Sequence, residues 1–267
     1  MRIALCIEYD GSAFHGWQTQ TGGGTVQDAL EAALSEIAGE PIAVVCAGRT
    51  DAGVHATAQV VHFDCGVARP RPLSAWVRGA NALLPASVAV RWAHAVADDF
   101  HARFSAFGRH YRYLLLNRPQ RPALAHGRAG WFHLPLDIDA MQAAAVQLLG
   151  EHDFSSFRAA ECQAKSPVKV LRRASVVQDG EMIIFDFEAS AFLHHMVRNM
   201  VGSLVYVGKG KYSPEWIGEL IAARDRRVAA PTFAAAGLYL SGVSYEPHWG
   251  LPPLPTPVLA GANHEQR

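Results

Sequence analysis

The sequence contains no motif for a bound nucleotide, a redox cofactor or a catalytic metal. A phosphate-binding P-loop, a Gly-x-Gly-x-x-Gly turn and a His-Glu-x-x-His pair are all absent. The four cysteines are far apart and form no Cys-x-x-Cys pair, so they predict neither a zinc knuckle nor a redox disulfide. They are typical of small buried hydrophobic residues in a reducing compartment. The residues therefore favour an activity that needs no cofactor.

Long apolar runs are missing as well. No uncharged apolar stretch reaches the roughly 18 residues that a membrane-spanning helix needs. Glu8 and Asp10 lie within the first apolar run, which a signal peptide would not tolerate. Half of the 267 residues are hydrophobic, enough for one or two domains with a sizeable core. We expect a globular protein of the cytoplasm.

Lysine is absent from one long basic segment, although the formal net charge of the whole chain is zero. Between Cys65 and Leu136 the only acids are Asp98 and Asp99, against ten arginines. Arginine suits forked contacts to phosphate and stacking on bases, so the segment indicates a nucleic-acid surface. The alternative, a solvated surface balanced by acids from elsewhere in the fold, stays open. The arginines are Arg69, Arg71, Arg78, Arg91, Arg103, Arg109, Arg112, Arg118, Arg121 and Arg128.

Periodicity predicts a β-α-β-β-α-β order for the first half, residues 1–106. Residues 3–10 alternate as a half-buried strand does. Thr25 is the expected N-cap, with Asp28 three residues on, of a helix that ends before Gly39. The apolar run at 42–45 predicts the next strand. The remaining predicted elements are a strand over 59–64, a helix over 73–83 and a strand over 88–96.

The second half, residues 107–246, begins again with a strand. Its predicted strands cover 109–116, 170–177, 182–188 and 238–245, and its helices 138–149, 192–207 and 214–223, the last with proline at its first position. The two halves predict an α+β fold of two pseudo-symmetric lobes, with antiparallel sheets flanked by helices. Residues 247–267 contain five prolines and no periodicity, and we expect them to form a disordered tail.

One glycine-punctuated loop, AGRTDAGVHA from Ala47 to Ala56, lies between two apolar runs. Such a loop can hold a reactive side chain toward a substrate, and Asp51 is the candidate. Its small neighbours would let another molecule approach the backbone closely, and Arg49 and His55 supply the nearby positive or protonatable groups. An ordinary turn, in which the aspartate accepts backbone N–H groups, suits the same residues equally well. The local chemistry alone does not choose between them.

This loop is one of five blocks that, in order and spacing, resemble the tRNA pseudouridine synthase A family. The others are EYDGSAFHGWQ (8–18), DDFHARFSA (98–106), RHYRY (109–113) and FLHHMVRNMVG (192–202). The resemblance covers nearly the whole chain, to about Tyr245. It implies the pseudouridine synthase fold with an active-site cleft between two lobes. It also implies that uridine is isomerised to pseudouridine in the anticodon arm of tRNA, at positions 38 to 40, by a homodimer without a cofactor.

Pseudouridine formation needs a group that stabilises or traps the electron-poor C1′ when its bond to N1 breaks. Asp51 can do so as the nucleophile, or as the base that forms a glycal, and the sequence leaves both routes open. Because the target base is stacked in RNA, it must also be flipped out. The resemblance implies that Arg49 takes the vacated place or grips the phosphate. An ordinary surface arginine is the alternative.

Tyr111 and Arg198 complete the candidate site. On a strand, Tyr111 and Tyr113 share one face and Arg112 points the other way. The resemblance implies that Tyr111 stacks on the flipped uracil and moves the C5 proton, whereas Tyr113 fits a core position. Arg198 lies on a predicted helix that is mostly apolar and therefore buried, so its charge needs a partner. In the family this arginine pairs with the catalytic aspartate.

The adjacent His194 and His195 invite a metal interpretation. Adjacent helical residues point about 100° apart, however, and no carboxylate follows on the next turn, so we expect no metal. Two rival functions stay open: a catalytically silent RNA-binding module that uses the arginines, and a metal-dependent hydrolase. The sequence also leaves open whether His55 is structural or functional, and how residues 18–24 fold.

Overall fold

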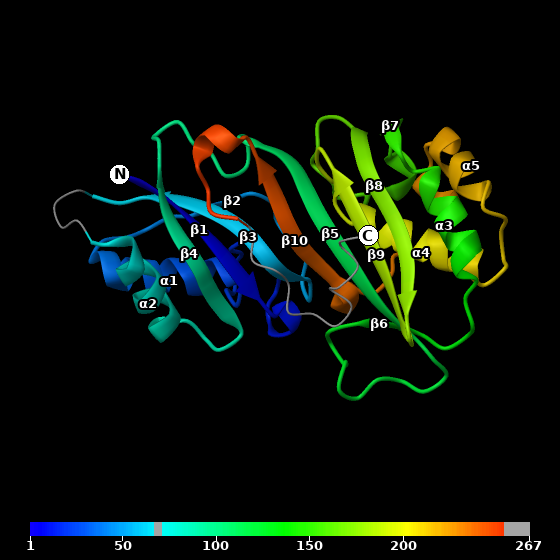
Figure 1. The fold of residues 1–267 in the computed structure, drawn as a ribbon, viewed down its shortest axis with the longest axis horizontal. Helices are drawn as coiled ribbons and strands as arrows, with labels where there is room; N and C mark the ends of the chain where they lie inside the picture. Colours follow the sequence, from blue (N-terminus) through cyan, green and yellow to red (C-terminus); the bar gives the residue numbers. More distant parts are fainter. Residues whose placement is uncertain (67–70, 254–267) are drawn as a thin grey trace. The chain divides into compact units, whose positions relative to one another are not determined.

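The computed structural model describes residues 1–66 and 71–253 (Figure 1). The chain contacts divide these residues into two compact units. The first unit comprises Met1–Phe107 and the stretch that starts at Tyr239, and the second comprises Gly108–Leu238. Within the described ranges, no helix combines the length and the apolar character that crossing a bilayer requires.

The first unit is built on a sheet with the strand order β4-β1-β3-β10, in which β2 pairs with β3 (Figure 1). β1 is antiparallel to both β3 and β4, and β10 runs parallel to β3. The helices α1 and α2 contact each other, and α2 contacts β4. The strands are β1 (Arg2–Tyr9), β2 (Val45–Cys46), β3 (His55–Asp64), β4 (Val88–Val96) and β10 (Leu238–Tyr245), and the helices are α1 (Val26–Ala38) and α2 (Leu73–Leu83).

The central strand β1 is more buried than the alternating pattern predicts. Ala4 and Cys6, on the face expected to be open, are as fully buried as Ile3 and Leu5. β1 lies between two neighbours, and small apolar residues on its second face cost little to cover. Burial raises the pKa of the Cys6 thiol to about 12. All four cysteines are buried and unpaired, which confirms the prediction that they are small core residues.

Helix α1 begins and ends where the sequence predicts. The Thr25 hydroxyl accepts the Asp28 N–H at 3.2 Å, and the Asp28 carboxylate accepts the Thr25 N–H at 3.2 Å. This reciprocal capping box satisfies two N–H groups that the first turn leaves without helical partners. Gly39 is the C-cap, with a φ of 73°.

The second unit is built on a sheet with the strand order β5-β9-β8-β7, and β6 pairs with β5 (Figure 1). Helix α3 contacts both β8 and α4. The strands are β5 (Ala106–Asn117), β6 (Gly130–Phe132), β7 (Gly150–Asp153), β8 (Val168–Asp179) and β9 (Met182–Ala189), and the helices are α3 (Ile138–Val146), α4 (Met196–Gly208) and α5 (Trp216–Ala223). The short strands β6 and β7 were not predicted, because three or four residues carry too little periodicity.

The helix predicted over 192–207 is wrong at its start. α4 begins at Met196, because His195 adopts the left-handed conformation, with a φ of 61°, and interrupts any helix before it. His194 and His195 therefore precede the helix, and the helical wheel does not apply to them. Similarly, α5 begins at Trp216, so Pro214 lies two residues before its first residue.

The C-terminal stretch differs from the predicted boundaries. Tyr239 pairs with His55 of β3, so β10 groups with the first unit and not with the lobe predicted over 107–246. In the expected disordered tail, Pro247–Trp249 form a 3₁₀ helix, and the Trp249 ring lies 5.2 Å from the Phe100 ring. An aromatic contact far away in sequence orders these residues, and periodicity does not report such a contact. Residues 254–267 of the predicted tail lie outside the described residues.

Candidate active site

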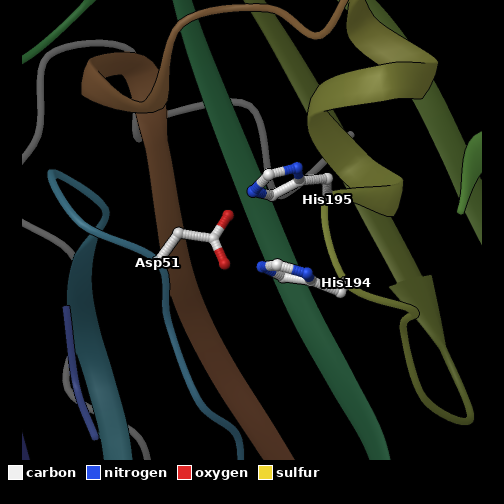
Figure 2. Close-up of side chains that lie close together, drawn as sticks. All are labelled: Asp51, His194 and His195. Carbon is white, nitrogen blue, oxygen red and sulfur yellow. The ribbon is translucent and has the colours of Figure 1, made fainter. Parts of the chain in front are cut away.

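Asp51 lies on a tight turn that leads into β3 (Figure 2). The Val54 N–H donates to the Asp51 carbonyl at 3.1 Å, and Gly53 between them has a φ of 76°. A type II turn requires this positive φ at its third position, which glycine adopts without strain. The Asp51 side chain is half-buried and Arg49 is exposed. The turn therefore presents both charged groups, as the sequence predicts for the candidate catalytic loop.

The N-terminal segment, residues 9–17, holds the Asp51 turn through contacts with Thr50. The Trp17 N–H donates to the Thr50 carbonyl at 3.0 Å, and the Tyr9 hydroxyl bonds the Thr50 hydroxyl at 2.8 Å. Gly16, with a φ of 92°, lies so close that an added Cβ would stand 2.8 Å from the Thr50 carbonyl oxygen. Backbone from two distant segments therefore meets directly at the residue before Asp51.

The loop over residues 18–24, which the sequence leaves open, is tied to α1. The Thr19 hydroxyl donates to the Asp28 carboxylate at 2.6 Å. The Gln20 side chain donates to the His15 carbonyl at 2.7 Å, and the His15 N–H donates to the Gly24 carbonyl at 2.9 Å. Asp28, which caps α1, thus also holds this loop, and its hydrogen bonds, the largest from Thr19, lower the pKa of its carboxyl group.

His55 occupies a structural position. Its side chain is 2 % exposed, and its ring stacks on Tyr239 with 4.6 Å between centroids. Nδ1 accepts the Gly11 N–H at 3.0 Å. Because Nδ1 is the acceptor of that bond, it carries no proton to donate to the Asp10 carboxylate 3.3 Å away. His55 thus joins β3, β10 and the N-terminal segment beneath the Asp51 turn.

Tyr111 and Tyr113 share one face of β5, as predicted. The Tyr111 ring meets Phe192 edge to face, with 5.0 Å between centroids. Tyr113 is fully buried, and its hydroxyl donates to the Ala234 carbonyl at 2.8 Å. Burial raises the pKa of the Tyr113 hydroxyl strongly. The prediction that Tyr113 is a core residue is confirmed.

Arg198 lies in the first turn of α4, against the segment that precedes β10. Its Nε donates to the Phe233 carbonyl at 2.9 Å, and its own carbonyl accepts the Phe233 N–H at 3.2 Å. The guanidinium also acts on the hydroxyl of Tyr113, whose pKa it lowers against the larger effect of burial. The stem of Arg198 is therefore fixed in place within the second unit.

His194 and His195 lie side by side just before α4 (Figure 2). Their rings are 4.0 Å apart between centroids and tilted by 37°. This corrects the prediction that the two side chains point far apart, which assumed a helix at these positions. The sequence signal was the His-His pair itself. Its geometry depends on the left-handed backbone of His195, which periodicity does not reveal.

Acids elsewhere in the fold balance part of the basic segment. Three ion pairs join Arg91 to Glu8, Arg112 to Asp186 and Arg118 to Glu181. Of the other described arginines of the segment, all but Arg109 are exposed. Arg69 lies outside the described residues. Both interpretations of the segment therefore keep some support.

Comparison with known proteins decides the family. A sequence model described as tRNA pseudouridine synthase matches residues 5–105 and 144–246. The chain belongs to the tRNA pseudouridine synthase family. The matched ranges of this isomerase family include Arg49, Asp51 and Arg198, whereas Tyr111 lies between them.

Relatives in the tRNA pseudouridine synthase family match almost end to end. A protein of Dechloromonas aromatica named tRNA pseudouridine synthase A is 70 % identical over 252 residues, which are 94 % of this chain and 95 % of that protein. Proteins of the same name from Aromatoleum aromaticum and Methylobacillus flagellatus are 62 % and 61 % identical over 252 residues. Each alignment covers 94 % of this chain, and 95 % and 96 % of those two proteins. The resemblance deduced from the five blocks is thereby confirmed.

The contact between Gly16 and Thr50 predicts a specific defect. In Gly16→Ala the new Cβ meets the Thr50 carbonyl, so the Asp51 turn must shift, and a shift of about 1 Å can cost on the order of 100-fold in rate. We expect pseudouridine formation to fall at least about tenfold, measured as single-turnover rate.

Gly22→Ala is the matched control for this variant. Gly22 also has a positive φ, 111°, but an added Cβ would meet nothing within 4 Å. Both variants should lose roughly 1–2 kcal/mol of stability from backbone strain, measured by thermal unfolding. Equal rates in the two variants would show that the contact with Thr50 does not position Asp51.

Proposed function

We propose that the protein isomerises uridine to pseudouridine in tRNA, with Asp51 as the catalytic carboxylate. The observation that carries the proposal is the match of the tRNA pseudouridine synthase family across the chain, with Asp51 inside the first matched range. The rigid turn at Asp51 supports it, because a nucleophile must be held in one geometry to react efficiently.

Of the two routes that stay open, we propose the nucleophilic one, which gives Asp51 a definite step. Its carboxylate attacks C1′ of the target uridine while the bond from C1′ to N1 breaks, and the electron pair leaves with the uracil. The uracil then rotates, C5 attacks C1′ and displaces the carboxylate. A base finally removes the proton from C5, and N1 takes up a proton. No oxidant, reductant or nucleotide enters this balance.

The other candidate residues take roles around the same uridine. We assign Tyr111 to stack on the uracil and to move the C5 proton, which an aromatic ring with a hydroxyl group can do. Arg49 is assigned to the RNA backbone or to the space that the flipped base leaves, which its exposure allows. Arg198 is assigned as the cation that keeps the Asp51 carboxylate charged.

The family assignment also supports a proposal for the substrate and the assembly. We propose the anticodon arm of tRNA, at positions 38 to 40, as the substrate, a homodimer as the active form and the cytoplasm as its location. The exposed arginines of the basic segment would bind the phosphates of the tRNA outside the catalytic site.

Asp51→Asn should abolish turnover and leave RNA binding nearly intact, because most of the affinity for RNA comes from phosphate contacts. The measurement is pseudouridine mapping on unmodified tRNA transcript, together with the dissociation constant, which should stay within roughly tenfold of wild type, about 1.4 kcal/mol. Asp99→Asn, a change of an exposed acid in the same unit, is the control. Wild-type turnover in Asp51→Asn would refute the mechanism.

The same assay tests Arg198 and the rival functions. If Arg198 acts on the reaction through its charge, then Arg198→Met should lower the single-turnover rate, and Arg198→Lys, which keeps the charge and loses the fork, should lie between it and wild type. A wild-type rate in a well-folded Arg198→Met protein would show that Arg198 is a structural residue. A chelator should leave turnover unchanged, and an RNA-binding module without activity would form no pseudouridine in any variant.

Tyr111 and Tyr113, two residues apart on β5, provide a matched pair of variants. Tyr111→Phe keeps the ring and removes the hydroxyl group, so single-turnover rates should fall while tRNA affinity holds. Tyr113→Phe loses the hydrogen bond to Ala234, which should cost about 1 kcal/mol of stability without slowing the reaction. The reverse pattern would exclude Tyr111 from proton transfer.

The homodimer is tested by dilution. Light scattering should give twice the chain mass, and activity per chain should fall when the protein is diluted below the dissociation constant of the dimer. A monomer that stays fully active at nanomolar concentration would contradict the proposed assembly.

A further inference from the structure

A phenylalanine on a rigid loop stands out of the first unit's surface. Phe104 is 77 % exposed and lies between β4 and β5. Single exposed apolar residues are common on protein surfaces, so exposure alone assigns no role. What distinguishes Phe104 is the loop that carries it, the ring behind it and the charges beside it.

The loop over residues 101–105 is closed and pinned by hydrogen bonds. The His101 N–H donates to the Ser105 hydroxyl at 3.0 Å, and the Ser105 N–H donates to the His101 carbonyl at 2.8 Å. Ala102 is held on both sides: its N–H donates to His62 Nδ1 at 3.1 Å, and its carbonyl accepts the Tyr245 hydroxyl at 2.6 Å. A loop held in this way presents its side chains in one conformation, so Phe104 cannot simply turn inward.

His101 backs the Phe104 ring. The two rings are stacked, with 4.3 Å between centroids and 28° between planes. Nδ1 of His101 accepts the N–H groups of both Arg103 and Phe104 at 3.2 Å. Burial, with the nearby Arg2, lowers the pKa of His101, so the imidazole is neutral at neutral pH. One face of Phe104 therefore rests on a fixed neutral ring.

One cation, Arg103, lies over this ring. The Arg103 guanidinium carbon lies 5.7 Å from the Phe104 centroid. Burial raises the pKa of the Cys46 thiol to about 11, and Arg49 and Arg103 both lie close enough to act in the opposite direction. Arg103 of the Phe104 loop and Arg49 of the Asp51 turn thus both lie near Cys46, within the first unit.

We propose that Phe104 is a stacking platform for an unpaired base of the RNA substrate, with Arg103 on the adjoining phosphate. Every base offers a face for stacking on an aromatic ring, and arginine adds contact to the backbone. The proposal rests on the proposed function, and it adds a binding position beyond the target uridine. The base stacks on the exposed part of the Phe104 ring, in series with His101.

RNA suits this surface better than a protein partner. The loop belongs to the segment with ten arginines, two acids and no lysine, and Arg103 of the loop lies over the ring itself. An apolar ring beside a guanidinium group matches a ligand that carries both aromatic bases and phosphates. A second copy of the chain is the competing occupant, and the experiment includes it.

The test uses an anticodon stem-loop RNA with 2-aminopurine at each unpaired position in turn. Wild-type protein should quench the fluorescence at one position, and Phe104→Ala should not. Phe104→Ala should also bind the stem-loop at least about fivefold more weakly, the lower end for loss of one base–aromatic stack. Phe104→Tyr should restore both signals, whereas Phe104→Leu should resemble the alanine variant, because it is apolar without an aromatic face.

Leu83→Ala is the control, because Leu83 is also an exposed hydrophobic residue of this unit, at 51 %. It should bind and quench as wild type does. Thermal unfolding, for stability, and light scattering, for oligomeric state, are measured for every variant. Unchanged affinity in Phe104→Ala, full function in Phe104→Leu, or a loss that appears only together with dimer dissociation would each overturn the proposal. Failure of wild type to form pseudouridine, with quenching intact, would refute the proposed function and leave the platform standing.

Discussion

The direct contact between the backbone of the N-terminal segment and the Asp51 turn is the constraint on which the candidate site depends. Trp17 binds the Thr50 carbonyl, and the first helical N–H groups of α1, those of Val26 and Gln27, bind the carbonyls of Gly16 and Trp17. The first N–H groups of α1, which have no partner within the helix, thus hold the segment at Gly16 and Trp17. That segment in turn holds the Asp51 turn. Any displacement of α1 would be passed to Asp51 through backbone alone.

The role proposed for Asp51 needs this arrangement, because a carboxylate nucleophile must meet C1′ in one geometry. A loop with the same sequence and no outside support would sample many conformations, each of which must be lost again on binding. His55 adds a second support from beneath, where it is buried against Tyr239 and bonded to Gly11. The turn is thus tied from two sides, while Arg49 and Ala52 stay exposed.

The second unit uses a buried tyrosine in a comparable way. Tyr113 binds the Ala234 carbonyl, and its ring meets Phe233, whose backbone bonds Arg198 in both directions. A hydroxyl group buried this deeply requires its hydrogen bond, since an unpaired one would cost about 1–3 kcal/mol. The position of Arg198 therefore depends on the backbone of Phe233 as well as on α4, whereas the Tyr113 hydroxyl bonds the neighbouring Ala234.

Local sequence determined much of the architecture. The alternation of β4, the capping box of Thr25 and Asp28, and the glycine after α1 are each signals carried by neighbouring residues, and these elements occur at the predicted residues. The family and the candidate Asp51 loop were also accessible, because the five blocks retain their order along the chain. Short-range patterns suffice wherever the deciding interactions are short-range.

Only the tertiary structure decided the rest. The left-handed φ of His195 delays the start of the predicted helix to Met196. Strand β10 pairs with β3, nearly two hundred residues away in the sequence, and Trp249 is ordered by its contact with Phe100. The sequence leaves the role of His55 open, whereas its burial and its bond to Gly11 fit a structural role. Phe104 is a large apolar residue, yet its pinned loop exposes it. In each case the deciding partner is distant in sequence, and local periodicity carries no information about distant partners.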